Sequence, residues 1–273
     1  MHPQFAMQRD WYDTPLYYDI IFDADTPKDG TFLEAAYQAY SLGRGGKRVL
    51  EPACGSGRLL SEMAWRGWKV SGFDLSQPML DYAAERLSNQ GLKATLWQDR
   101  MESFAKIKPG TFDLAHCLVS TFKYLLTEAH AAAHLRLVAE ALRPGGIYAL
   151  GIHLTDYART SCEHERWVAE RDGVHVVCNT RDWPADPKKR LEDVRNRLSI
   201  TNKDGKKHVQ ETRWQFRTYS AAQMKTLLRK VPAFELVACH DFTHDITATR
   251  ELDDSYPDVV MVLRRRMPTD TAG

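Results

Sequence analysis

The chain has 273 residues, of which 43% are hydrophobic and 27% are charged, as is typical of a globular protein. Its formal net charge is +1, and proteins that bind duplexes usually carry a basic surplus, so we expect no nucleic-acid partner. The five cysteines are scattered and include no Cys-x-x-Cys pair, so neither a disulfide framework nor a metal site is expected. The sequence shows no secretory signal and no apolar run long enough to span a membrane. We therefore expect a cytoplasmic protein without a membrane partner.

Short apolar runs alternate with amphipathic helical patterns over the first two-thirds of the chain. This alternation predicts a parallel sheet with helices on both of its faces. The segment before residue 42 is rich in aromatic residues and predicts helices that pack over the top of the sheet. The predicted strands cover 47–53, 69–74, 93–98, 112–119 and 146–154, and the predicted helices cover 58–66, 77–89 and 128–142.

The pattern changes at about residue 159, where polar and apolar residues begin to alternate as in antiparallel strands. The turn sequence "NKDGKK" lies between two such segments and predicts a hairpin. A helix that Ser220 can cap and two closing strands follow. We therefore divide the chain into helices and an α/β core (1–158), an inserted antiparallel β region that serves as a substrate lid (159–218), and a closing helix with strands of the core (219–273).

A glycine turn follows the first strand of the core, in the sequence "VLEPACGSG". Gly55 and Gly57 let the backbone approach a ligand closely, and the amides of a helix follow them. Asp74 ends the second strand, where a carboxylate can accept the ribose hydroxyls of an adenosine. A dinucleotide-binding fingerprint would need a third small residue after Gly57, but Leu60 stands in that place. Such a fingerprint also has no need for an acid before the glycines, where this sequence has Glu51.

These residues, together with "WQDRMESF" (97–104), "FDLAHCLVSTFKYL" (112–125) and "LRPGGIYAL" (142–150), resemble the ordered motifs of class I S-adenosylmethionine-dependent methyltransferases. The resemblance covers about residues 45–155. It implies an α/β fold with a doubly wound, Rossmann-like, mostly parallel sheet of seven strands, here with an inserted antiparallel β lid. It also implies that S-adenosyl-L-methionine is the cofactor.

The resemblance assigns roles to individual residues of the cofactor site. It implies that Glu51 reaches the methionine ammonium and that Asp74 takes the ribose hydroxyls. The remaining residues implied to bind the cofactor are Ala53, Gly55 and Gly57 around the methionine and ribose, Leu75 and Met79 on the adenine, Asp99, Arg100 and Met101 around its edge, and Leu118 in the channel to the acceptor.

Two residues are candidates for catalysis. Tyr18 belongs to a "YYD" sequence similar to that of small-molecule N-methyltransferases of the sugar and glycine type, whose N-terminal tyrosines close over the sulfonium. A simple packing role for these aromatic residues is equally compatible with the sequence. His153 ends the fifth strand, at the edge where ligands bind, and is the best candidate for a general base. We interpret His116, within the fourth strand, as a hydrogen-bonded core residue.

The sequence therefore predicts an enzyme that transfers a methyl group from S-adenosylmethionine to a nitrogen or oxygen of a small molecule. A protein or RNA acceptor is the alternative, although no "NPPY"-type tetrapeptide follows the fourth strand, where "CLVSTF" stands. A nicotinamide-dependent oxidoreductase is a weaker alternative because of Glu51 and the missing third glycine.

Overall fold

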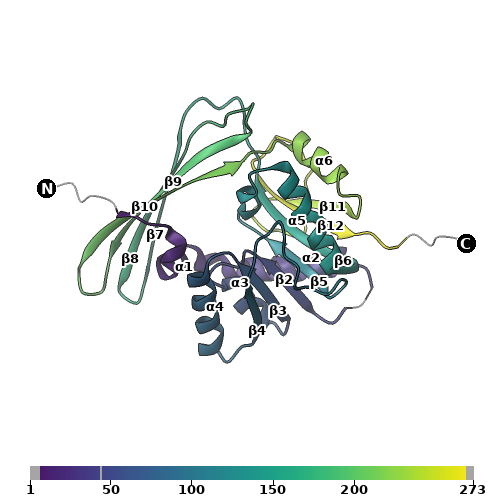
Figure 1. Cartoon of the computed structure of the whole chain (residues 1–273), viewed down its shortest axis with the longest axis horizontal. Coiled ribbons are helices and arrows are strands. Elements are labelled where there is room, and N and C mark those ends of the chain that lie inside the picture. The colour runs from purple at the N-terminus through teal and green to yellow at the C-terminus, as the bar shows by residue number, and fades with distance from the viewer. Residues whose placement is uncertain (1–6, 44, 269–273) are drawn as a thin grey trace, which may run out of the picture.

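A computed structural model describes residues 7–43 and 45–268 of the chain. A seven-stranded sheet forms the core, and a smaller five-stranded sheet projects from it (Figure 1). In the part of the chain that the structure describes, no helix is both long and apolar enough to cross a membrane.

The core sheet confirms the predicted fold class. Its strand order is β11-β12-β6-β5-β2-β3-β4, and β12 runs antiparallel to both of its neighbours, β6 and β11. The order reverses between β2 and β5, which makes the carboxyl ends of these two strands the place where an open α/β sheet binds ligands. The strands are β2 (Arg48–Pro52), β3 (Lys69–Asp74), β4 (Ala94–Gln98), β5 (Phe112–Cys117), β6 (Leu142–His153), β11 (Phe234–His240) and β12 (Asp258–Arg265).

Helices cover both faces of this sheet. Side chains of α5 (Glu128–Ala141) and α6 (Ala221–Arg229) join one apolar cluster, and those of α2 (Thr26–Tyr40) and α3 (Arg58–Trp65) join another. Helix α4 (Gln77–Asn89) packs beside β3 and β4. Ser220 caps α6 as predicted. The "RPGG" sequence does not form a separate turn, because β6 begins at Leu142 and bends where Gly145 takes a φ of +76°.

The inserted sheet consists of four long antiparallel strands and one short parallel strand. Its order is β1-β10-β9-β8-β7, so β7 is the free edge. The pairing of β1 with β10 was not predicted, because it joins residues about 200 positions apart. The strands are β7 (Glu163–Arg171), β8 (Val174–Asp182), β9 (Leu191–Thr201), β10 (Lys207–Arg217) and β1 (Met7–Gln8).

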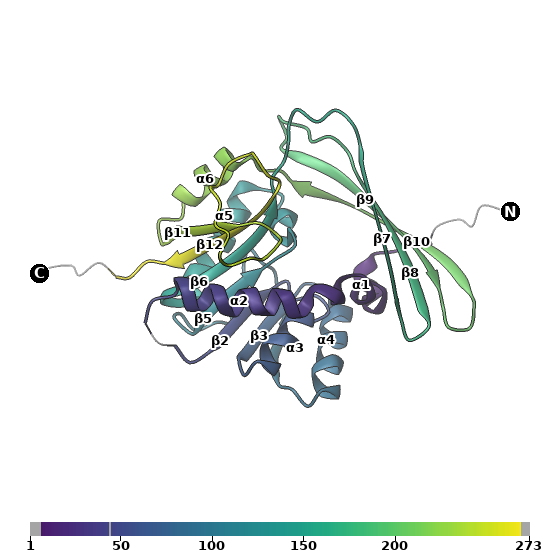
Figure 2. The same ribbon diagram turned by 180° about the vertical axis from the view of Figure 1, so that it is seen from behind.

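The N-terminal helices lie differently from the prediction. Helix α2 runs along one face of the core sheet, while α1 (Pro15–Phe22) lies where the core meets the inserted sheet (Figure 2). The aromatic residues of α1 and of the preceding turn, Trp11–Asp13, pack on Val176, Leu198 and Ile200. These three residues give one side of the inserted sheet, which we call the inner face, an apolar patch that needs cover. The aromatic residues cover this patch, while Tyr18 also reaches the carboxyl ends of the core strands.

Two glycines with positive φ allow a matched test of the close packing behind the glycine turn. A Cβ on Gly57 would lie 2.7 Å from the Cβ of Ala83 in α4, whereas a Cβ on Gly67 would meet nothing within 4 Å. We expect Gly67→Ala to lower the free energy of unfolding by about 1 kcal/mol through backbone strain alone. Gly57→Ala adds overpacking and should cost roughly 2–4 kcal/mol. Urea denaturation measures both values, and equal losses would contradict this account.

Candidate active site

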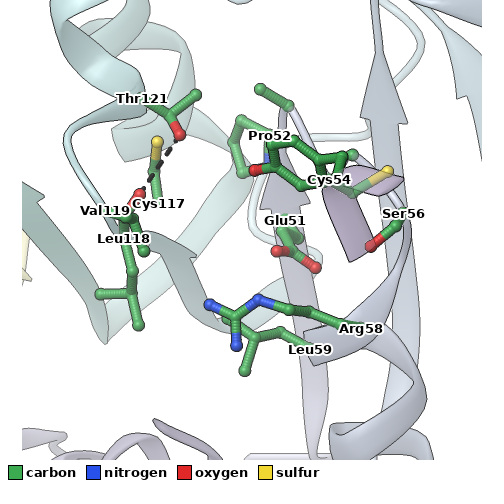
Figure 3. A pocket seen from close by; sticks show the side chains of 13 residues that line it. Glu51, Pro52, Cys54, Ser56, Arg58, Leu59, Cys117, Leu118, Val119 and Thr121 are labelled. Atoms are coloured by element: carbon green, nitrogen blue, oxygen red, sulfur yellow. Dashed lines mark hydrogen bonds between the residues drawn. The ribbon is translucent and has the colours of Figure 1, made fainter. Parts of the chain in front are cut away.

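A pocket lies at the carboxyl ends of β2 and β5, where the strand order reverses. We call it the switch-point pocket. Its walls come from the turn after β2, the start of α3, the turn after β5 and one side chain of α1 (Figure 3). The lining residues are Tyr18, Glu51, Pro52, Ala53, Cys54, Gly55, Ser56, Arg58, Leu59, Cys117, Leu118, Val119 and Thr121.

The turn after β2 has a backbone that most side chains disfavour. Ala53, Gly55 and Gly57 all have positive φ values, between 52° and 70°. The Gly55 amide donates to Asp74 Oδ2 at 2.8 Å, so the turn is tied to the end of β3. Gly57 does not line the pocket itself; it begins α3 and lets that helix approach α4.

Asp74 lies beside this turn with both carboxylate oxygens held by backbone amides. Besides the Gly55 amide, the amide of Ser76 donates to Asp74 Oδ1 at 2.8 Å. Burial raises the pKa of Asp74 above its ordinary value, against the lowering effect of these hydrogen bonds. The two amides fix the carboxylate in one orientation, and each oxygen keeps a further lone pair for a hydroxyl donor.

The residues predicted around the adenine lie near Asp74 but not in the lining of the switch-point pocket. Leu75 is exposed and offers an apolar surface, whereas Met79 is fully buried below the cap of α4. The Asp99 amide donates to the Asp74 carbonyl at 3.1 Å, which places Asp99 next to the end of β3. Arg100 is exposed and pairs with Glu102, and Met101 is partly buried against the core. Their roles stay predictions.

The most unusual group in the pocket is the carboxylate of Glu51. The residue is 8% exposed, and its Oε2 has no hydrogen-bond partner among the described residues. Burial raises the pKa of Glu51 well above its ordinary value, although Arg58 opposes this shift. A buried carboxylate with one oxygen left unpaired is costly, so the site is suited to receiving a positive charge.

His116 lies close to Glu51, but it does not compensate the carboxylate. The His116 Nδ1 lies 3.8 Å from Glu51 Oε1, and neither ring nitrogen has a hydrogen-bond partner within the described ranges. Burial lowers the pKa of His116 to about 3, so its ring is neutral at physiological pH. His116 is thus buried, as predicted, but it is not a hydrogen-bonded core residue.

Arg58, which the sequence analysis missed, supplies the opposite charge. It extends from the first position of α3, and its guanidinium lies across the pocket from Glu51 (Figure 3). Its Nη1 donates to Thr26 Oγ1 at 3.0 Å and to Asp29 Oδ2 at 2.8 Å, which holds the side chain in place. A carboxylate and a guanidinium that face each other without pairing match the ammonium and carboxylate of an α-amino acid. The signal in the sequence was a basic residue directly after "GSG".

Tyr18 closes the pocket from the side of α1. Its ring approaches Gly55, where an added Cβ would lie 3.9 Å from Tyr18 Cε1. Burial raises the pKa of Tyr18 to about 12, so the phenol stays protonated at neutral pH and is not suited to act as a base. Tyr12, on the same segment, donates from its hydroxyl to that of Tyr124 at 2.7 Å.

His153 lies at the carboxyl end of β6 but does not line the switch-point pocket. Its Nδ1 lies 2.5 Å from Asp258 Oδ1, and its side chain is 45% exposed. Asp258 orients the ring, so Nε2 is the nitrogen available to take a proton. The amide of His153 donates to Ser120 Oγ at 2.7 Å, which fixes the turn after β5. In that turn Leu118 lines the pocket, while Val119 and Ser120 have φ values of 58° and 63°.

Residues 49–146 match a family model described as a methyltransferase domain. A ubiquinone biosynthesis O-methyltransferase of Dechloromonas aromatica (strain RCB) is 37% identical over 109 residues, which is 40% of this chain and 44% of that protein. An S-adenosylmethionine-dependent methyltransferase from Clostridium acetobutylicum has a similar solved structure, with a TM-score of 0.73 and 17% identity over 94% of this chain and 99% of that one. The sugar N-methyltransferase KedS8 from Streptoalloteichus has a TM-score of 0.70 and 17% identity over 96% of this chain and 95% of that one.

These matches identify residues 49–146 as a methyltransferase domain, and together with the fold they support a class I S-adenosylmethionine-dependent methyltransferase. Its cofactor supplies a methyl group on a positively charged sulfur. The site fits this molecule: the unpartnered Glu51 Oε2 would meet the ammonium, Arg58 the carboxylate, and Asp74, which lies beside the pocket at the Gly55 amide, the ribose. We found no group of three or more His, Cys, Asp or Glu side chains that could hold a metal ion in residues 7–43 and 45–268.

Truncated ligands test the assignment of Arg58. We expect Arg58→Met to raise the Kd for S-adenosylmethionine about tenfold or more, because a charge-assisted hydrogen bond to the carboxylate is lost. The Kd for 5′-methylthioadenosine, which lacks the amino acid, should stay unchanged. Asp74→Asn serves as the matched control and should weaken both ligands. Calorimetry measures all of these constants. An equal loss for both ligands in Arg58→Met would contradict the assignment.

Proposed function

We propose that this methyltransferase transfers the methyl group to a nitrogen or oxygen of a small molecule bound between the switch-point pocket and the inner face of the inserted sheet. The observation that carries the proposal is a row of polar side chains across that face. Glu165, Thr180, Asn196 and Thr212 occupy adjacent positions on β7, β8, β9 and β10. Asn196 and Thr212 are the buried members of this row, and Thr212 is satisfied because it accepts from the Trp11 amide and donates to the Arg9 carbonyl. Asn196 is the buried member with a donor left to pair.

Asn196 is the clearest sign that this row binds a ligand. It is 1% exposed, and its Nδ2 has no partner among the described residues, while its Oδ1 accepts from Cys178 Sγ at 3.2 Å. The buried Nε1 of Trp214, on the neighbouring strand β10, is likewise without a partner there. Buried donors of this kind cost free energy unless a ligand accepts from them. An acceptor molecule with hydroxyl or carbonyl oxygens would satisfy both donors.

The inner face is continuous with the roof of the switch-point pocket. Trp214 stacks on Trp11 with ring centroids 5.2 Å apart, and its ring lies 6.3 Å from that of Tyr124. Tyr124 in turn contacts Tyr12, whose carbonyl accepts from Ser76 beside Asp74. A small acceptor held on the inner face would therefore lie within reach of the pocket.

The charges at the open end of the row favour an amine among the acceptors. Glu165 interacts electrostatically with His153, Asp182 and Asp258, and partial burial raises its pKa above the ordinary value. Carboxylates in this arrangement attract a cationic amine and hold it near His153. In the reaction, the ammonium first gives a proton to His153 Nε2 or to water, which frees the lone pair of the acceptor nitrogen. That lone pair then forms a bond to the methyl carbon while the carbon–sulfur bond breaks toward sulfur.

In this proposal, most of the rate acceleration comes from the positioning of the acceptor relative to the methyl donor. Holding the acceptor atom, the methyl carbon and the sulfur in line can supply roughly 7–11 kcal/mol of the barrier. The names of two similar proteins, an O-methyltransferase of ubiquinone biosynthesis and a sugar N-methyltransferase, support a small-molecule acceptor and leave both acceptor atoms open.

The proposal is tested with a radioactive methyl donor and a cell extract separated into small-molecule and macromolecular fractions. Label should enter a small molecule. With that acceptor, His153→Gln should lower kcat by about 10²–10⁴ at neutral pH if the amine arrives protonated, with an unchanged Kd for S-adenosylmethionine. His164→Gln, on exposed β7, is the matched control. Label in protein or RNA would contradict the proposed acceptor class, and an unchanged rate in His153→Gln would remove the base from the mechanism.

A further inference from the structure

Asp19 of α1 is a fully buried carboxylate that no step described above uses. It is 0% exposed, and groups from three separate parts of the chain converge on it. Ser56 Oγ of the glycine turn donates to Asp19 Oδ1 at 2.7 Å, and the Tyr82 hydroxyl of α4 donates to Oδ2 at 3.1 Å. Two guanidiniums, of Arg86 in α4 and Arg171 in β7, also bind Oδ2, the latter at 2.7 Å.

Asp23 lies one turn further along the chain and shares the same two arginines. Arg86 Nη1 is 3.0 Å from Asp23 Oδ1, and Arg171 Nη1 is 3.3 Å from Asp23 Oδ2. The two carboxylates and two guanidiniums balance each other in charge. The two acids differ in surroundings, because Asp23 is partly exposed and makes no hydrogen bond to the glycine turn among the described residues, whereas Asp19 is buried and binds Ser56. Removing one member of a buried charge group leaves another without compensation.

The neighbours of Asp19 are parts of the switch-point pocket. Ser56 lines its floor, and Tyr18, the residue before Asp19, closes its side. The same carboxylate therefore fixes the glycine turn and the tyrosine that packs against it. Arg171 adds the inserted sheet to this group, since it ends β7.

We propose that Asp19 is a positioning residue for the methyl donor, which holds the glycine turn through Ser56 and links that turn to the inserted sheet through Arg171. This inference rests on the placement of the donor in the switch-point pocket and is independent of the identity of the acceptor. It predicts that changes in the inserted sheet at Arg171 alter donor affinity, although Arg171 does not line the pocket.

The Asp19→Asn substitution could weaken ligand binding through a change in charge or through a change in geometry, and the two effects predict different changes in affinity. Asp19→Asn leaves two arginines with one carboxylate, and the extra positive charge would repel S-adenosylmethionine more than S-adenosylhomocysteine, whose sulfur is neutral. Loss of the Ser56 contact would weaken both ligands alike. Because Ser56 binds Asp19 directly, we expect the geometric effect to dominate.

The test measures the Kd values of both ligands by calorimetry for the full chain. We expect Asp19→Asn to raise both Kd values about tenfold, since a hydrogen bond to a charged group is lost. Ser56→Ala should raise both Kd values by a similar factor. The double variant should bind the ligands no more weakly than the single variant with the larger loss of affinity, because both substitutions act through one contact.

Asp23→Asn is the matched control and should change Kd by less than about twofold. Arg171→Gln should raise Kd by about threefold or more.

Steady-state kinetics separate positioning from a general structural defect. Asp19→Asn should raise the KM for the donor and leave kcat at saturating donor within about twofold, because the bound donor restores the turn. Ser56→Ala tests the same contact without disturbing the buried charges. Equal effects of Asp19→Asn and Asp23→Asn, or additive effects of Asp19→Asn and Ser56→Ala, would overturn the inference. Unchanged binding in Asp74→Asn would instead overturn the placement of the donor.

Discussion

The buried carboxylate of Glu51 is the constraint on which the rest of the site depends. It lies on β2 in register with Gly72 of β3, in the middle of the core sheet, where water has little access. Its neighbour His116 is neutral, so it offers no charge in return. Arg58 lies across the pocket rather than against the carboxylate, since Asp29 holds its guanidinium. The protein thus keeps a carboxylate and a guanidinium apart in a buried place. The ammonium of an amino acid would compensate the carboxylate, and its carboxylate would meet the donors of the guanidinium that Asp29 leaves free.

The long-range contacts around this pocket bring together two sheets that are distinct in the chain. Asp19 of α1 connects the glycine turn with β7, and buried Lys123, after β5, pairs with Glu192 of β9 at 2.5 Å. Each connection joins an element that lines or borders the switch-point pocket to a strand of the inserted sheet. An acceptor that binds the inner face would therefore act on elements that also shape the pocket.

The sequence predicted the core well because its signals are local. Strand–helix alternation gave the order of the elements, and consecutive parallel strands place their carboxyl ends at one edge, which is why the turn with Gly55 and the end of β3 with Asp74 lie together. Arg58 and Asp19 were missed because their roles depend on partners distant in the chain. Likewise, the packing of α1 on the inserted sheet follows from an apolar face that exists only once four strands have paired.

The central claim is that the donor ammonium binds the buried carboxyl group of Glu51. Its raised pKa falls on binding, so between the two pKa values the donor should release a proton and bind more tightly as the pH rises. Calorimetry in buffers of different ionisation enthalpy, between about pH 5 and pH 7 where the α-ammonium keeps its proton, measures this release. We predict proton release and a rising affinity for the wild type, and neither for Glu51→Gln. Equal release by the variant, or none by the wild type, would contradict the account.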